Sequence, residues 1–204
     1  MEKEMDLSIA LFIREQRKRD QEAQRESQEN SYDLKAHITY TLEDLIEGVR
    51  RGKQYLYTLR LEFEPRKLLE GRITIPYIKN FFDVEEDGAE TALLASNQRK
   101  AAMNFSHCGD KILELSLDEW MAETKELMKK MHLYIKPERK KSLGNLEYFC
   151  FTVPTSGGRL YNVTFRMRKD GRLYAGALNC PEKEREGMGL LLEAVVCVIE
   201  EMNR

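Results

Sequence analysis

The clearest pattern of apolar and polar positions lies between residues 145 and 181. Within residues 161–168 apolar side chains alternate with polar ones, and this period of two predicts a strand with one buried face and one face in water. The polar positions are Asn162, Thr164, Arg166 and Arg168. Residues 149–153 and 174–180 repeat the alternation on either side, so we predict three consecutive strands.

Two glycine-containing turns join these strands. Asp170-Gly171 tolerates the positive φ angles of a tight hairpin turn, and Ser156-Gly157-Gly158 supplies a slightly longer turn. Pro181 ends the third strand, because proline has no N–H to donate to a ladder. The segment is therefore predicted to be an antiparallel meander.

The helix predicted after the meander is apolar around most of its circumference. Its expected buried stripe consists of Met188, Leu191, Leu192, Val195, Ile199 and Met202. A second apolar face contains Leu190, Ala194, Cys197 and Val198. Because such a helix is usually buried on more than one side, we expect the N-terminal segment or another subunit to cover this second face.

Another amphipathic helix is predicted to begin after Ser116, since Ser116 and Glu119 have the spacing of a capping box. Its apolar stripe consists of Leu117, Trp120, Met121, Thr124, Leu127, Met128 and Met131. The position of Trp120 on this stripe favours a role in the core over a role in ligand binding.

The region between residues 32 and 75 contains short segments with the period of a strand and one segment with the period of a helix. We predict strands at residues 32–40, 55–63 and 72–75, with a short helix from 42 to 51. Thr41 is expected to cap that helix and Gly52 to end it.

The remaining segments are less regular. Residues 77–96 contain an acidic run, Glu85-Glu86-Asp87, which we interpret as an exposed turn. Residues 100–106 and 111–115 are expected to form a hairpin. The basic residues 136–141 are expected to form a solvated loop, although they could also bind phosphate or an acidic partner.

The first 31 residues are predicted to be a charged helical arm or linker before a single domain at residues 32–204. The short apolar head of this arm includes Leu7 and Leu11, and from Arg14 to Asn30 only Ala23 is apolar. Opposite charges at helical spacing favour a solvated arm. The alternative is a partner-binding helix that uses Leu7 and Leu11.

Composition narrows the class of protein. With 204 residues, 42% hydrophobic and 33% charged, the chain suits one α+β domain and an extension. A net charge of −2 argues against nucleic acid as the main ligand. The N-terminus has the pattern of neither a signal peptide nor a membrane span of about 20 apolar residues, so we expect no membrane span and a cytoplasmic location.

No set of residues has the spacing of a known catalytic, cofactor or metal site. The three histidines fall in separate elements, and the neighbours His107 and Cys108 would point to opposite faces of a strand. The four cysteines include no CxxC pair, and Cys150, Cys180 and Cys197 lie in apolar segments, which is typical of small buried side chains in a reducing compartment. We therefore predict no cofactor and favour a protein that is not an enzyme.

Three segments carry a resemblance to a known fold. They are Ile73-Thr74-Ile75-Pro76, the capped helix at Ser116, and the last meander strand from Gly171 to Pro181. Across residues 71–202 their order resembles the PsbP/DcrB-like α/β fold, which a photosystem accessory protein, a yeast Ran-binding release factor and adaptor chaperones of bacterial secretion systems share. The resemblance implies an α-β-α sandwich that binds a protein partner through its sheet or edges without catalysis.

Together these observations favour a non-catalytic protein-binding adaptor or chaperone-like module, bacterial and associated with secretion or a toxin. The candidate partner-binding residues are Asn162, Thr164, Arg166, Arg168, Leu190, Ala194, Val198, Leu7 and Leu11. One alternative is a small-ligand-binding protein or enzyme with a pocket between the sheet and residues 77–96, near His107. A second alternative is a homo-oligomer, such as a dimer formed through the two apolar ends.

Overall fold

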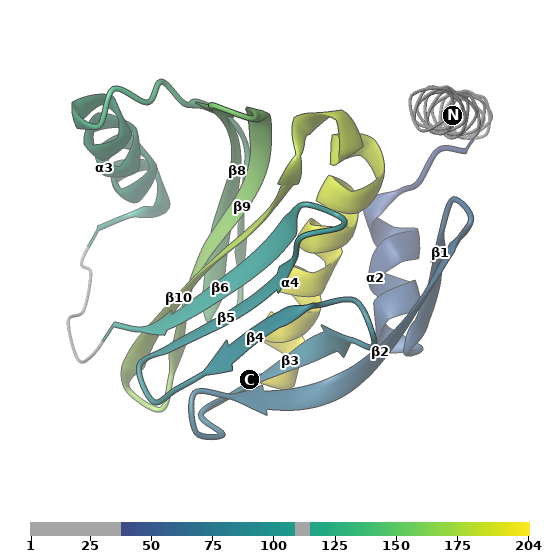
Figure 1. The fold of residues 1–204 in the computed structure, drawn as a ribbon. Coiled ribbons are helices and arrows are strands. Elements are labelled where there is room, and N and C mark those ends of the chain that lie inside the picture. Colours follow the sequence, from purple (N-terminus) through teal and green to yellow (C-terminus); the bar gives the residue numbers. More distant parts are fainter. Residues whose placement is uncertain (1–37, 109–114) are drawn as a thin grey trace, which may run out of the picture. The chain divides into compact units, whose positions relative to one another are not determined.

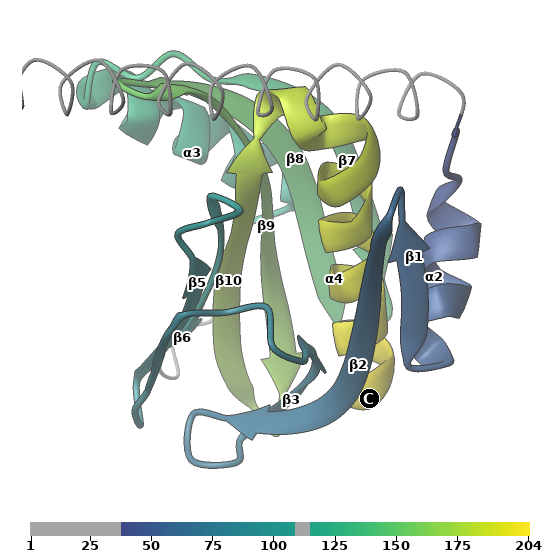
Figure 2. The same ribbon diagram turned by 45° about the vertical axis from the view of Figure 1, so that its right-hand side comes forward.

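A seven-stranded antiparallel sheet organises the computed structural model, which describes residues 38–108 and 115–204. Its strands follow the order β4-β5-β6-β10-β9-β8-β7; Figure 1 labels all of them except β7, which is labelled in Figure 2. In chain order they are β4 (Val84–Asp87), β5 (Thr91–Ser96), β6 (Ala101–His107), β7 (Lys136–Leu143), β8 (Leu146–Thr155), β9 (Gly158–Lys169) and β10 (Arg172–Pro181).

A second antiparallel sheet and three α-helices complete the described elements. The sheet contains β1 (Lys53–Leu56), β2 (Leu59–Leu68) and β3 (Ile73–Ile78), and the helices are α2 (Leu42–Arg50), α3 (Leu117–Lys130) and α4 (Leu190–Met202). A short 3-10 turn, η1 (Glu182–Glu184), and a π-helical turn, η2 (Arg185–Gly189), lead into α4. The predicted α+β class is confirmed.

The chain divides between Thr39 and Tyr40, so the unit from Tyr40 to Arg204 is described by itself. The predicted arm at residues 1–31, with Leu7 and Leu11, lies outside the described residues, as does most of the predicted strand at 32–40. Ile38, Thr39 and Tyr40 are described and have no regular secondary structure.

The predicted meander is confirmed as β8, β9 and β10. Asp170 and Gly171 have φ angles of 51° and 73°, which is the turn conformation that their sequence favours. In the register, Phe165 of β9 lies opposite Gly176 of β10. A Cβ atom at Gly176 would lie 2.3 Å from the Phe165 ring, so the glycine allows this large side chain to pack in the core.

Helix α4 forms the centre of the main core, and eleven of its thirteen residues are buried. It contacts β9 on one side and α2 and β3 on the other, as Figures 1 and 2 show. The second apolar face of α4 is therefore covered by this same chain, through α2 and β3. This finding corrects the expectation that the N-terminal arm or another subunit would cover that face.

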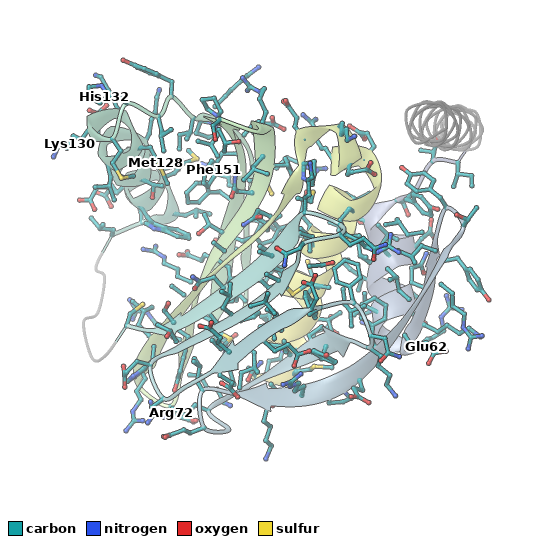
Figure 3. All side chains as sticks on the ribbon, in the orientation of Figure 1. Glu62, Arg72, Met128, Lys130, His132 and Phe151 are labelled. Carbon is teal, nitrogen blue, oxygen red and sulfur yellow. The ribbon has the colours of Figure 1, made fainter. Side chains whose placement is uncertain are left out.

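A smaller core lies on the opposite face of the large sheet, beneath α3. It contains Ile135, Phe149, Phe151 and Val153, with Leu117, Trp120, Met121 and Met128 of α3 packed against it. Met128 and Phe151 mark this region in Figure 3. Strand β8 is thus buried on both faces, because Tyr148 and Cys150 belong to the main core.

Several predicted elements differ from the observed ones. The strand predicted at 55–63 is a hairpin of β1 and β2, which turns at Tyr57 with a φ of 55°. Residues 77–96 contain β4 and β5, and the acidic run belongs to β4. The predicted basic loop is the edge strand β7. Of the hairpin predicted after residue 100, the first strand is β6, which lies between β5 and β10, and most of the second strand, predicted at 111–115, lies outside the described residues.

Candidate functional site

Arg166 joins the large sheet to the start of α3. In the register it lies opposite Glu147, and its Nε donates a hydrogen bond of 2.8 Å to a Glu147 carboxylate oxygen. Its Nη2 donates to the carbonyl oxygen of Leu115. Only 8% of Arg166 is exposed, so the structure corrects its predicted role: Arg166 is an internal clamp and offers little surface to a partner.

Trp120 completes this clamp from the side of α3. The Cζ atom of Arg166 lies 4.8 Å from the centre of the indole ring, which is a cation–π geometry. The Trp120 ring also contacts the Phe149 ring edge to face, with the ring centres 4.8 Å apart. The predicted core role of Trp120 is consistent with these contacts, although the side chain remains half-buried.

The beginning of α3 is also fixed by the predicted capping box. The Ser116 hydroxyl accepts a hydrogen bond from the backbone N–H of Glu119, and the Glu119 carboxylate accepts from the backbone N–H of Ser116. These bonds satisfy two N–H groups at a helix end that otherwise lack partners. Helix α3 is therefore anchored at its first turns.

The end of α3 exposes several large apolar side chains. Residues 125–136, here called the α3 tip, expose 57% of Leu127, 51% of Met131 and 70% of Tyr134. Among the described residues only two other large apolar side chains are exposed, Ile38 and Tyr55. Three of five therefore fall within eight residues of the chain, and α3 has no fully buried residue of its own.

The α3 tip also carries an excess of positive charge. It contains four lysines and one glutamate, a net charge of +3 with its histidine neutral. The Nζ atom of Lys129 lies 3.8 Å from a carboxylate oxygen of Glu126, which is an ion pair. Lys125, Lys130 and Lys136 form no ion pair with another described residue. Lysine near the end of a helix interacts favourably with the helix dipole, which accounts for Lys129 and Lys130 but not for Lys136 beyond the helix.

The other predicted residues of the meander lie on the face of the sheet that α3 partly covers. The side-chain amide of Asn162 donates to the carbonyl oxygen of Leu160, and the hydroxyl of Thr164 donates to that of Gly176, so both bond to nearby backbone. Both residues are half-buried, whereas Arg168 is exposed near the end of β9. The structure thus brings these residues to one face without forming a shared site.

The predicted binding residues of the last helix are buried. Leu190 is 8% exposed, Ala194 is fully buried and Val198 is 2% exposed. Their predicted role as an open surface is corrected, because α2 and β3 pack on α4. The apolar pattern of α4 predicted that this face is covered. The short helix α2 that covers it lies almost 150 residues earlier in the chain, and no local sequence pattern indicates that α2 and α4 pack together.

A buried polar cluster connects edge strand β7 to α4. Glu193 is 1% exposed, and its carboxylate accepts a hydrogen bond of 2.6 Å from the Tyr161 hydroxyl and a further one from Arg139. Burial raises the pKa of the Tyr161 phenol. Sequence reasoning overlooked this cluster, although a single carboxylate within the apolar run of α4 was an available signal.

His107 and Cys108 do not act together. The His107 Nδ1 atom lies 3.2 Å from a Glu90 carboxylate oxygen and 3.5 Å from Arg72 Nη1, and the ring lies against Tyr174. The Cys108 thiol instead lies 4.0 Å from the carbonyl oxygen of Ser106. Within residues 38–108 and 115–204, no three His, Cys, Asp or Glu side chains gather as a metal site would require.

No protein-family model matches the chain, and no curated protein matches it. A solved structure of a protein of unknown function from Pseudomonas aeruginosa aligns with 60% of this chain and 85% of its own, at 11% identity and a TM-score of 0.38. A score at that level does not establish a common fold. No helix in the described part of the chain is long and apolar enough to cross a membrane.

Proposed function

We propose that this chain is a non-catalytic protein-binding module, an adaptor or chaperone-like protein, and that the α3 tip is its contact surface. The observation that carries the proposal is the exposure of Leu127, Met131 and Tyr134 at one end of a helix that is anchored at the other end. Large apolar side chains that gather on a surface and are bordered by charge are typical of interaction sites. Methionine suits this role because its flexible side chain adapts to the partner.

The placement of the other candidate residues supports the α3 tip over the surfaces that the sequence suggested. Arg166, Leu190, Ala194 and Val198 have partners within the chain. The lysine-rich edge strand β7 is also a poor template for an added strand, because its charges, Pro137 and an irregular register discourage pairing. The proposed contact therefore uses side chains of α3.

The proposal is tested by purifying the tagged full chain from the cells that express it naturally, beside the double variant Leu127→Ser, Met131→Ser. We expect one partner to copurify in stoichiometric amount with the natural chain and to be lost from the double variant. A Tyr55→Ser variant, changed at an exposed residue of β1, is the matched control and should retain the partner. Equal recovery with all three chains, or no partner, would contradict the proposal.

Self-association is measured separately by light scattering on the full chain and on a chain that begins at Ser31. A monomer at all concentrations fits an adaptor that binds another protein. A dimer that dissociates in the Leu127→Ser, Met131→Ser variant would overturn the adaptor interpretation in favour of a homo-oligomer. A dimer that depends on residues 1–30 would assign assembly to the N-terminal segment and leave the α3 tip available.

A further inference from the structure

We propose that the partner element recognised by the α3 tip is an acidic amphipathic α-helix. This inference rests on the proposed function and adds the chemistry of the partner. It follows from three properties of the tip: the kind of backbone it presents, the spacing of its apolar side chains, and the sign of its charge.

The backbone of α3 cannot extend a sheet. Its N–H and C=O groups are bonded within the helix up to the C-cap, where the N–H of Met131 bonds to the carbonyl oxygens of Leu127 and Met128. A partner segment that packs on the helical part of the tip, at Leu127 and Met131, therefore gains few backbone hydrogen bonds there. A segment that buries its own apolar side chains here satisfies its backbone best by forming a helix.

The apolar side chains of the tip have the spacing that helix–helix packing uses. Leu127 and Met131 are four residues apart, so they lie on one face, about one helical turn from each other. Met128, between them, turns toward the smaller core and packs against it. The two exposed side chains thus form a ridge that can fit between side chains of a second helix.

The charge of the tip selects the sign of the partner. Lys125, Lys130 and Lys136 have no ion pair among the described residues, so their charges are available to a carboxylate. Glutamate or aspartate beside the apolar stripe of the partner would be attracted to these lysines, while a basic helix would be repelled.

An anionic membrane surface is the main competing ligand for a basic, apolar patch. The first two turns of α3 carry Asp118, Glu119 and Glu123, all of them exposed. These carboxylates would meet the same lipid surface if the helix lay flat on it, which opposes binding. A helical partner can instead contact the tip alone, so the observations favour a protein.

The test uses a designed peptide of about five helical turns, with leucines on one face and glutamates along its borders, labelled for fluorescence anisotropy. We expect it to bind the full chain, with an affinity that falls as salt is added. Lys125→Glu, Lys130→Glu should weaken binding about tenfold or more, and Leu127→Ser, Met131→Ser by a similar factor. A lysine-bordered version of the peptide should bind the natural chain less tightly and the Lys→Glu variant more tightly.

Several results would overturn the inference. They are equal binding of the two peptides, binding that the Leu127→Ser, Met131→Ser variant retains, and binding of phosphatidylserine-containing vesicles through the tip without binding of the acidic peptide. If the natural partner depends on Leu127 and Met131 but neither peptide binds, the proposed function stands and the acidic-helix chemistry is wrong. If the acidic peptide binds but no natural partner depends on these residues, the proposed function fails while the surface chemistry is supported.

Discussion

The guanidinium group of Arg166 lies over the indole ring of Trp120, with Cζ 4.8 Å from the ring centre. Arg166 comes from the middle of the sheet and Trp120 from the first turn of α3, so this contact holds the helix on the sheet. None of the residues of α3, Leu117–Lys130, is fully buried. The helix is thus fixed to the sheet near its beginning, and near its end Met128 packs on the smaller core while Leu127 and Met131 remain exposed.

Replacement of Trp120 by alanine is expected to destabilise the unit. The change removes the contacts with Phe149 and Arg166, and a Trp→Ala change in a full core costs about 3–5 kcal/mol. Because Trp120 is half-buried, we expect about 2 kcal/mol, measured by urea unfolding. Leu127→Ala, on the same helix but exposed, should change the free energy of unfolding by less than about 0.5 kcal/mol. Equal effects of the two changes would contradict the proposed anchoring.

A double-mutant cycle measures the coupling between the two residues of the clamp. Arg166→Ala removes the ion pair with Glu147, which is partly exposed and keeps its hydrogen bond from the Ser142 hydroxyl, so the change should cost about 2 kcal/mol. The effects of Arg166→Ala and Trp120→Ala should not be additive, with a coupling energy of about 0.5–2 kcal/mol, because the side chains touch. Additive effects would show that the stacking contributes nothing to stability.

The Glu193 cluster predicts an order of stabilities among carboxylate variants. Glu193→Ala leaves the buried hydroxyl of Tyr161 without its carboxylate acceptor and removes the ion pair of Arg139, which keeps its hydrogen bond to Tyr161, and we expect a loss of about 3 kcal/mol. Glu193→Gln keeps an acceptor for Tyr161 and should cost less. Glu64→Ala removes one half of an exposed pair with Lys79 and should cost less than about 1 kcal/mol. Chemical unfolding of the three variants checks this order, and a Glu193→Ala protein as stable as Glu64→Ala would refute the account.

Alkaline pH is expected to unfold the protein through buried thiols and phenols. Burial raises the pKa of Cys180 from 9.0 to about 12, and it also raises the pKa values of Cys150, Tyr148 and Tyr161. The unfolded chain loses these protons at lower pH than the folded chain does. Stability should therefore be unaffected by these groups below about pH 8 and fall as pH rises through 9 and beyond, by up to about 1.4 kcal/mol per pH unit for each group.

The contribution of one thiol can be isolated with Cys180→Ala. This variant removes a single titrating group, so its free energy of unfolding should fall less steeply than that of the natural chain between about pH 9 and 12. The comparison of slopes is independent of the packing that the substitution removes, because lost packing lowers stability at every pH. Parallel pH profiles would contradict the assigned role of Cys180.

The parts of the fold that were predicted from sequence are those whose local chemistry agrees with their tertiary role. The meander carries its own turn residues, and α3 carries its capping box at Ser116. The β1–β2 turn was overlooked because Tyr57-Thr58 contains no residue that favours a turn, and the alternation continues across it. Strand β7 was overlooked because this solvent-exposed edge strand has almost no apolar residues. Its strand conformation depends on pairing with β8, which its own sequence does not indicate.

The candidate site was harder to predict than the fold. Arg166 and Arg168 occupy similar positions in the alternation, and only the placement of Trp120 and Glu147 shows that Arg166 is enclosed. The stripe of α3 reads as uniformly buried, but near the end of the helix Met128 packs on the smaller core while its neighbours on the stripe, Leu127 and Met131, are exposed. The extent of the surface on which a helix packs cannot be derived from the hydrophobic period of that helix alone.

The most direct test of the central claim is site-specific photo-crosslinking in the cells that express the protein. A photoreactive phenylalanine analogue replaces Tyr134 in the α3 tip, and in a matched chain it replaces Tyr55, which is 54% exposed in β1. We predict one discrete crosslinked product from position 134, lost on adding Leu127→Ser and Met131→Ser, and none from position 55. No product from position 134, or the same product from both positions, would contradict the assignment of the α3 tip as the binding surface.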